Sequence, residues 1–168
     1  IGITWIGLSK NCMKKILITG INGFVGPHLV AELQKQGYSI YGLSRTGDGE
    51  LKNDIVILKG DLLELKELYL TINELKPDAI FHLAAQSKPG YSFKEPQETF
   101  QSNIIGTTNL FEVIRGMMND DSSYRPRVIV AGSSEEYGLV SESHLPLVET
   151  SKFNPVNPYA ISKVAQYY

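Results

Sequence analysis

The chain has 168 residues, of which 42% are hydrophobic and 20% charged, a composition typical of a globular protein with one core. Sixteen Lys and Arg against eighteen Asp and Glu give a net charge of −2, which excludes general electrostatic attraction to nucleic acid or to an anionic membrane. A single cysteine, Cys12, excludes a disulfide framework, and no Cys or His cluster has metal-ligand spacing, so we expect a metal-free protein of the cytoplasm.

The first twelve residues are predicted to lie outside the folded domain. Residues 1–12 lack the basic leading segment and the small-residue cleavage site of a secretory signal, and no apolar run in the chain reaches the roughly 18 residues of a membrane span. Met13 is followed by two lysines and a strand, so we interpret residues 1–12 as an upstream or non-native leader, with a short ordered extension as the alternative. One domain is expected over residues 13–168.

Apolar, partly β-branched runs alternate along the chain with segments of helical periodicity. Strands are expected at residues 15–19, 38–43, 54–58, 79–83 and 127–131, and helices at residues 23–36, 62–75, 97–118 and from Pro158 onward. The apolar positions in register are Val25, Leu29 and Leu33 in the first helix, Leu65, Leu68, Ile72 and Leu75 in the second, and Phe100, Ile104, Phe111 and Ile114 in the third. This alternation predicts an α/β fold, a doubly wound parallel sheet of Rossmann type that binds a ligand at the carboxyl edge of its strands.

Three glycines stand between the first strand and the first helix. Gly20, Gly23 and Gly26 follow at intervals of three residues, one residue away from the G-x-G-x-x-G dinucleotide fingerprint. Gly20 would allow the turn out of the strand, Gly23 the approach of a pyrophosphate, and Gly26 close packing of helix on sheet. A plain strand-to-helix turn is the alternative. The predicted dinucleotide site also includes the intervening residues Asn22, Phe24 and Val25.

The ends of the second and third strands bear on the choice of cofactor. An acid at the end of the second strand would favour NAD(H), but the residues there are Ser44 and Arg45, which suit the 2′-phosphate of NADP(H). We therefore predict NADP, with NAD less favoured and a solvated Arg45 as the alternative. Asp61 follows the third strand, where it could receive the adenine amino group or cap a helix that begins at Leu62.

Tyr159 and Lys163 stand at i and i+4 in the last predicted helix, whose first turn is marked by Pro158. A nearby ammonium group favours the phenolate form of a tyrosine, so this pair can supply a general acid or base and its activator. The lysine can also hold the ribose of a nicotinamide nucleotide. An exposed aromatic beside a solvated lysine is the alternative.

Small and acidic residues follow the fifth predicted strand. In Gly132-Ser133-Ser134-Glu135-Glu136 the first hydroxyl, that of Ser133, can bond the same substrate oxygen as the tyrosine. The carboxylate of Glu135 can reach an adjacent C–H. We predict carbonyl and alcohol redox chemistry at this edge, with an extra base for elimination.

These motifs resemble, in order and spacing, the extended short-chain dehydrogenase/reductase family of nucleotide-sugar enzymes. The residues that carry the resemblance are Thr19 to Gly26, His82-Leu83-Ala84-Ala85-Gln86-Ser87, Gly132 to Gly138, and Tyr159 to Lys163. Within that family the chain is similar to the GDP-mannose 4,6-dehydratases and the GDP-4-keto-6-deoxymannose reductases. The resemblance covers residues 13–168.

The resemblance implies roles for individual residues. Ser133 orients the sugar C4 oxygen, Tyr159 is the base at that hydroxyl, Lys163 supports it, and Glu135 removes the C5 proton. In the dehydratases that the chain resembles, hydride passes from C4 to NADP⁺, water leaves from C6, and the hydride returns to C6, so the cofactor would end unchanged. The resemblance further places Leu83, Ala84 and Ala85 at the cofactor, Ser87 beside the hexose, and Asn103 in a structural position.

Two departures from family patterns bear on the substrate. Ser134 replaces the aspartate of dTDP-glucose dehydratases, and Glu136 is typical of the reductases. We predict an NADP-dependent enzyme that converts GDP-mannose to GDP-4-keto-6-deoxymannose. The alternatives are the GDP-4-keto-6-deoxymannose reductase, another nucleotide-sugar epimerase or dehydratase, and a non-catalytic dinucleotide-binding module.

The resemblance also bears on the carboxyl end and on assembly. The chain ends inside the last predicted helix without a capping residue, so residues 13–168 are interpreted as an NADP-binding domain that stops before the substrate-binding lobe. The fragment is expected to be inactive and poorly soluble, and the full-length protein to form a homo-oligomer through residues 97–118 and the helix from Pro158. His28, His82 and His144 show no metal-ligand pattern and are not predicted to act at the site.

Overall fold

The structure is a computed structural model that describes residues 14–47 and 55–168, so the predictions for residues 1–12 and for residue 54 lie outside the described residues. The strands are β1 (Lys15–Thr19), β2 (Ser39–Ser44), β3 (Val56–Lys59), β4 (Ala79–His82) and β5 (Arg127–Val130). They form one parallel sheet in the order β3-β2-β1-β4-β5. The chain starts in the middle, runs to one edge and then crosses to the other side, which confirms the predicted doubly wound sheet.

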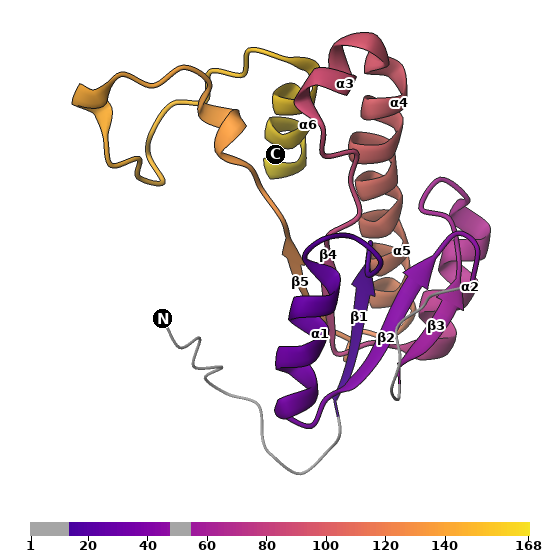
Figure 1. The fold of residues 1–168 in the computed structure, drawn as a ribbon. Coiled ribbons are helices and arrows are strands. Elements are labelled where there is room, and N and C mark those ends of the chain that lie inside the picture. The colour runs from indigo at the N-terminus through magenta and orange to yellow at the C-terminus, as the bar shows by residue number, and fades with distance from the viewer. Residues whose placement is uncertain (1–13, 48–54) are drawn as a thin grey trace.

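Helices cover both faces of this sheet, because successive side chains of a strand point to opposite faces (Figure 1). Helix α1 (Gly26–Lys35) packs on one face, where Ile16 and Ile18 of β1 join a buried cluster with Val30 and Leu33. Helices α2 (Leu65–Leu75) and α5 (Gly106–Asp120) pack on the other face. The core there consists of Leu17, Leu43, Leu68, Ile72, Leu75, Ile80, Leu110, Val113, Ile114 and Met117. The two cores hold the strand ends in place at the carboxyl edge.

The helix predicted over residues 97–118 is interrupted by a π-helical turn. The chain forms α4 (Pro96–Phe100), a π-helix η1 (Gln101–Ile105) and then α5. A π turn takes up an extra residue, so periodicity counted across it moves out of register. The expected face is wrong in part: Ile114 is buried, but Phe111 is 40% exposed. Asn103 and Thr107 point inward instead, which brings polar side chains into the core.

Two predicted helix starts are early by three residues. Helix α1 begins at Gly26, so Val25 lies outside the core with 53% of its surface exposed. Helix α2 begins at Leu65, which is also exposed at the first turn. Both starts follow turns, residues 20–25 and 61–64, whose apolar side chains continue the helical pattern without being helical. Apolar spacing alone could not separate turn from helix here.

The remaining helices lie beyond the carboxyl edge of the sheet. Helix α3 (Pro89–Lys94), which the sequence reading missed, lies beside α4 and α6 (Pro158–Tyr167). After β5 come the 3₁₀ turns η2 (Ser134–Tyr137) and η3 (Glu142–His144), and the chain from η2 to α6 projects away from the sheet (Figure 1). In the part of the chain that is described, no helix is long and apolar enough to cross a membrane.

Candidate active site

The exits of β1 and β4 touch each other at the carboxyl edge of the sheet. Gly20 has φ +70° and lies against the chain after β4, where a Cβ would stand 2.6 Å from the backbone nitrogen of Ala84. That nitrogen also donates to the hydroxyl of Thr19 at 3.3 Å, and Leu83 N–H donates to the Thr19 carbonyl at 3.1 Å. The glycine loop and the Leu83-Ala84-Ala85 segment, which the resemblance implies lie at one cofactor, are therefore direct neighbours.

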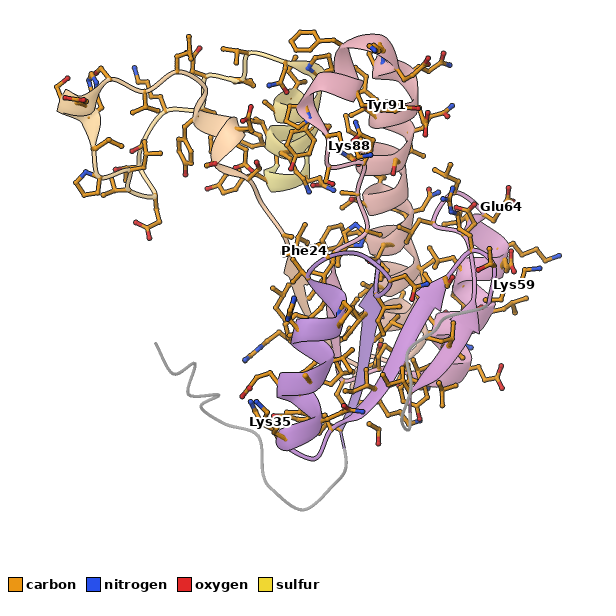
Figure 2. All side chains as sticks on the ribbon, in the orientation of Figure 1. Phe24, Lys35, Lys59, Glu64, Lys88 and Tyr91 are labelled. Carbon is orange, nitrogen blue, oxygen red and sulfur yellow. The ribbon has the colours of Figure 1, made fainter. Side chains whose placement is uncertain are left out.

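The glycine loop leaves its backbone open above α1. Gly26 cannot carry a side chain, because a Cβ would lie 1.8 Å from the carbonyl oxygen of Ile21. Asn22 and Gly23 are exposed, and Phe24 stands 89% exposed on the loop between β1 and α1 (Figure 2). No side chain caps the amino end of α1. An exposed glycine turn before a helix without a side-chain cap fits a pyrophosphate, whose negative charge the positive amino end of the helix would attract.

The ends of β2 and β3 lie side by side. Gly60 N–H donates to the Ser44 carbonyl at 3.0 Å, and the Ser44 hydroxyl bonds that of Thr46 at 3.2 Å. Arg45 is exposed next to them. Asp61 accepts from the backbone nitrogen of Leu63 at 2.9 Å. The suggested cap of a helix from Leu62 is wrong, because α2 begins at Leu65; Asp61 closes the preceding turn instead.

Tyr159 and Lys163 are both buried on the inner side of α6, with 7% and 5% of their surfaces exposed. The ammonium nitrogen of Lys163 lies 5.9 Å from the centre of the Tyr159 ring. It donates to the carbonyl oxygen of Ala131, just after β5, at 2.9 Å. Burial lowers the pKa of Lys163, and the negative charge of Glu136 opposes that shift. The alternative of an exposed tyrosine and a solvated lysine is therefore wrong.

The turn after β5 is held by a capping box. The Ser133 hydroxyl accepts from Glu135 N–H at 3.2 Å, and the carboxylate of Glu136 accepts from Ser133 N–H at 2.7 Å. Glu136 is buried, so this second acid orients the backbone around Ser133. From the sequence Glu136 was noted only as a residue typical of the reductases, and its role in holding this turn was not predicted.

The carboxylate of Glu135 is tied to the start of α6. Its Oε2 accepts from the Nδ2 of Asn157 at 2.9 Å, while the Oδ1 of Asn157 accepts from Ala160 N–H at 2.7 Å. Asn157 thus caps the helix and positions the acid at once. Sequence reasoning did not single out Asn157, although an Asn followed by a Pro is a signal for a helix start.

Asn103 connects the chain after β4 to α6. Its amide oxygen accepts from Gln86 N–H at 2.7 Å, and its amide nitrogen donates to the Gln86 carbonyl at 3.0 Å and to the Ser162 hydroxyl at 2.8 Å. Ser162 in turn donates to the carbonyl of Tyr159. The structural role expected for Asn103 corresponds to these contacts. Ser87, the neighbour of Gln86, is exposed on the loop before α3.

His82, which the sequence did not indicate as a site residue, lies buried between two hydroxyl groups. Its Nδ1 is 2.7 Å from the Thr19 hydroxyl and its Nε2 is 2.9 Å from the Thr107 hydroxyl. Burial, together with the nearby charge of Lys163, lowers its pKa to about 4, so the ring is neutral at pH 7. Among residues 14–47 and 55–168 no group of three or more His, Cys, Asp and Glu side chains could hold a metal ion.

Comparisons with known proteins show which family the chain is similar to. A family model described as GDP-mannose 4,6 dehydratase matches residues 17–168. The chain is 34% identical over 170 residues to the GDP-mannose 4,6-dehydratase of Yersinia enterocolitica, covering 93% of this chain and 44% of that one. It is 34% identical over 152 residues to the GDP-6-deoxy-D-mannose reductase of Pseudomonas aeruginosa, covering 90% and 44%.

Two solved structures of similar fold contain a nicotinamide dinucleotide. RMD from Pseudomonas aeruginosa complexed with NADPH matches with a TM-score of 0.68 at 32% identity, over 91% of this chain and 47% of that one. UDP-glucose 4-epimerase from Brucella ovis in complex with NAD matches with a TM-score of 0.80 at 28% identity, over 92% and 46%. This chain spans under half the length of these relatives. It belongs to the GDP-mannose 4,6-dehydratase family.

Proposed function

We propose that the protein carrying this chain is an NADP-dependent dehydratase that converts GDP-mannose to GDP-4-keto-6-deoxymannose. The observation that carries the proposal is the carboxylate of Glu135, held by Asn157 at 2.9 Å on the same capped turn as Ser133. A dehydratase needs a base for a C–H next to the carbonyl it forms, in addition to the tyrosine that serves the hydroxyl. An enzyme limited to carbonyl reduction would need only the tyrosine.

Tyr159 is the acid–base group in this proposal. Lys163 is buried and its ammonium nitrogen lies 5.9 Å from the centre of the Tyr159 ring, so its positive charge acts on the tyrosine with little screening by solvent. Ser133, fixed in extended backbone by the capping box, supplies a hydroxyl to the same sugar oxygen. The substrate C4 hydroxyl would give its proton to Tyr159 while Ser133 holds the oxygen.

The residues proposed for the cofactor are the glycine loop with Asn22, Phe24 and Val25, the ends of β2 and β3 with Ser44, Arg45, Asp61 and Leu62, the segment Leu83-Ala84-Ala85, and the pair Tyr159 and Lys163. When bound, the nicotinamide accepts a hydride and returns it. The exposed guanidinium of Arg45 favours NADP over NAD, because it can pair with a 2′-phosphate. Arg45→Glu is expected to raise the Kd for NADP at least 10-fold while leaving that for NAD within about twofold.

The test is turnover by the full-length protein. With GDP-mannose it should form a 4-keto-6-deoxy product without net change in NADPH absorbance. Glu135→Gln should lower kcat by about 10² to 10⁴-fold, whereas Glu142→Gln, a matched change in the exposed turn η3, should not. Conversion of other nucleotide sugars but not GDP-mannose would contradict the substrate, and an active Glu135→Gln enzyme would contradict the elimination step.

The second candidate is the GDP-4-keto-6-deoxymannose reductase. It is favoured by the similarity to the Pseudomonas aeruginosa reductase, which matches at the same identity as the Yersinia enterocolitica dehydratase. That activity would consume one NADPH for each 4-keto-6-deoxy sugar reduced. It would also survive Glu135→Gln, so one variant and one absorbance measurement separate the two candidates. Other nucleotide-sugar epimerases or dehydratases would be recognised by their products.

A non-catalytic dinucleotide-binding module remains the alternative from another class. A Tyr159→Phe variant that behaves like the wild type in every turnover assay would support this module, whereas the enzyme should lose turnover. The cytoplasmic location, the assignment of residues 1–12 and 13–168, the inactivity of the 168-residue fragment and a homo-oligomer formed through residues 97–118 and α6 stay predictions. Size-exclusion chromatography of the full-length protein tests the last of these.

A further inference from the structure

Gln166 lies one turn after Lys163 on α6 and touches it directly. The Oε1 of Gln166 accepts from the ammonium nitrogen of Lys163 at 2.8 Å. The Nε2 of the same amide donates to the Asn103 carbonyl at 2.9 Å and to the Thr107 hydroxyl at 2.6 Å. One side chain therefore joins the lysine to the π-helical turn and to the start of α5.

The orientation of the Gln166 amide follows from its neighbours. Lys163 can only donate and the Asn103 carbonyl can only accept, so the amide oxygen must face the lysine and the nitrogen must face the carbonyl. Both hydrogens of the nitrogen are then used. No other arrangement of this amide satisfies both partners.

The number of donors and acceptors on each group also determines the proton positions in the contacts beyond Gln166. The single hydroxyl hydrogen of Thr107 goes to the Asn103 carbonyl at 2.6 Å, so the oxygen of Thr107 can only accept from Gln166 and from His82. His82 therefore carries its proton on Nε2, and its Nδ1 accepts from the Thr19 hydroxyl. The oxygen of Thr19 then accepts from Ala84 N–H beside Gly20. Every contact from Lys163 to the glycine loop has one donor and one acceptor.

We propose that Gln166 is a positioning residue, which fixes the ammonium group of Lys163 through its amide oxygen and links it to the buried His82 and the glycine loop. The inference rests on the function proposed for Lys163. Gln166 and the Ala131 carbonyl together take two of the three ammonium hydrogens, which leaves one for the nicotinamide ribose or Tyr159. A held ammonium keeps this last hydrogen in one direction.

No other residue type supplies these contacts at this position. A glutamate would keep the acceptor for Lys163 but would set a second acceptor against the Asn103 carbonyl. A methionine has the length of glutamine without either polar atom. These two substitutions therefore change the interaction with Lys163 in opposite senses.

The charge of Lys163 depends on a small set of groups. The groups that face it are Glu136 on η2, which favours the charged form, His82 on β4, which is neutral, and Tyr159 on α6. Burial disfavours the charge and lowers the pKa of Lys163. Loss of a hydrogen bond to the charged form should lower that pKa further, and a carboxylate in its place should raise it.

The experiment is an NMR titration of the full-length protein labelled with ¹³Cε-lysine, with the Lys163 signal assigned by its loss in Lys163→Met. Gln166→Met should move the Lys163 midpoint down by about one pH unit, and Gln166→Glu should move it up by a similar amount. Gln36→Met removes a matched amide at the exposed end of α1, where it donates to Glu32, and should leave the midpoint unchanged. The alkaline limb of the kcat profile should follow the same order.

A midpoint that moves in neither variant, or in the same direction in both, overturns the inference. Should Gln166→Met fail to fold, Gln166→Glu decides alone, since an unmoved or lowered midpoint overturns the inference and a raised one supports it. Opposite shifts in a protein without turnover would uphold the positioning role while refuting the proposed function. Turnover with an unmoved Lys163 midpoint would refute the positioning role while leaving the proposed function intact.

Discussion

Replacement of Asn103 by alanine should release the loop after β4 from α6. Asn103 is fully buried and makes hydrogen bonds of 2.7 and 3.0 Å to the backbone of Gln86 and of 2.8 Å to Ser162. Each such bond contributes a net ~1 kcal/mol, so Asn103→Ala should cost about 3 kcal/mol, with a small further cost for the cavity. The loss falls on local stability, because the partners belong to one loop and one helix.

Hydrogen–deuterium exchange of the full-length protein measures this loss where it occurs. If opening of the Gln86 amide becomes easier by about 3 kcal/mol, its exchange should accelerate on the order of 10²-fold. Asn119→Ala removes an exposed asparagine near the end of α5 and should change exchange at Gln86 by less than about twofold. Unaltered exchange at Gln86 in Asn103→Ala would refute the reasoning.

The aspartate variant tests whether the amide donors matter. Asn103→Asp keeps the acceptor for Gln86 N–H but turns an oxygen toward the Gln86 carbonyl and toward the Ser162 hydroxyl, whose own hydrogen goes to the Tyr159 carbonyl. The Gln86 amide should therefore exchange at least as fast in Asn103→Asp as in Asn103→Ala at pH 7. Protection restored by aspartate would show that the donors contribute nothing.

Three further predictions follow from the same contacts. Gly26→Ala should lower the free energy of unfolding by at least about 2 kcal/mol, because its Cβ would lie 1.8 Å from a backbone oxygen. Gly90→Ala adds a Cβ that meets nothing within 4 Å, so its thermal midpoint should equal that of the wild type. Equal thermal midpoints for the two variants would contradict the prediction. The folded-state pKa of His82, about 4, lies below the ordinary 6.5, so its contribution to stability is complete above pH 6.5 and up to about 3 kcal/mol is lost as the pH falls toward 4. Urea midpoints between pH 7 and pH 4 should therefore fall less in His82→Gln than in the wild type, and parallel curves would count against a buried neutral histidine. Asn157→Ser keeps an oxygen to cap α6 but loses the contact with Glu135, so kcat should drop about 10-fold with the thermal midpoint nearly unchanged, and full activity would remove Asn157 from the site.

Much of the architecture was predictable because it depends on local spacing. The alternation of strands with helices, the glycine turn after β1 and the pair Tyr159 and Lys163 on one helix face all follow from backbone periodicity within a few residues. The carboxyl edge as the ligand site follows from the parallel order of the strands. Residues that act within one element were therefore recognised from their neighbours in the chain.

The sequence by itself determined the fold class and the chemistry-bearing motifs, and the tertiary structure decided which side chains support them. The π-helical turn moved Asn103 and Thr107 inward against the expected apolar face, and no local pattern announces such a turn. Gln166 meets Asn103 across 63 positions of the chain, and His82 meets Thr19 across the same separation. A hydrogen bond needs its two atoms within about 3 Å in the right direction. That condition is met only when β1, β4, α5 and α6 have packed, so these partners became visible in the folded molecule alone.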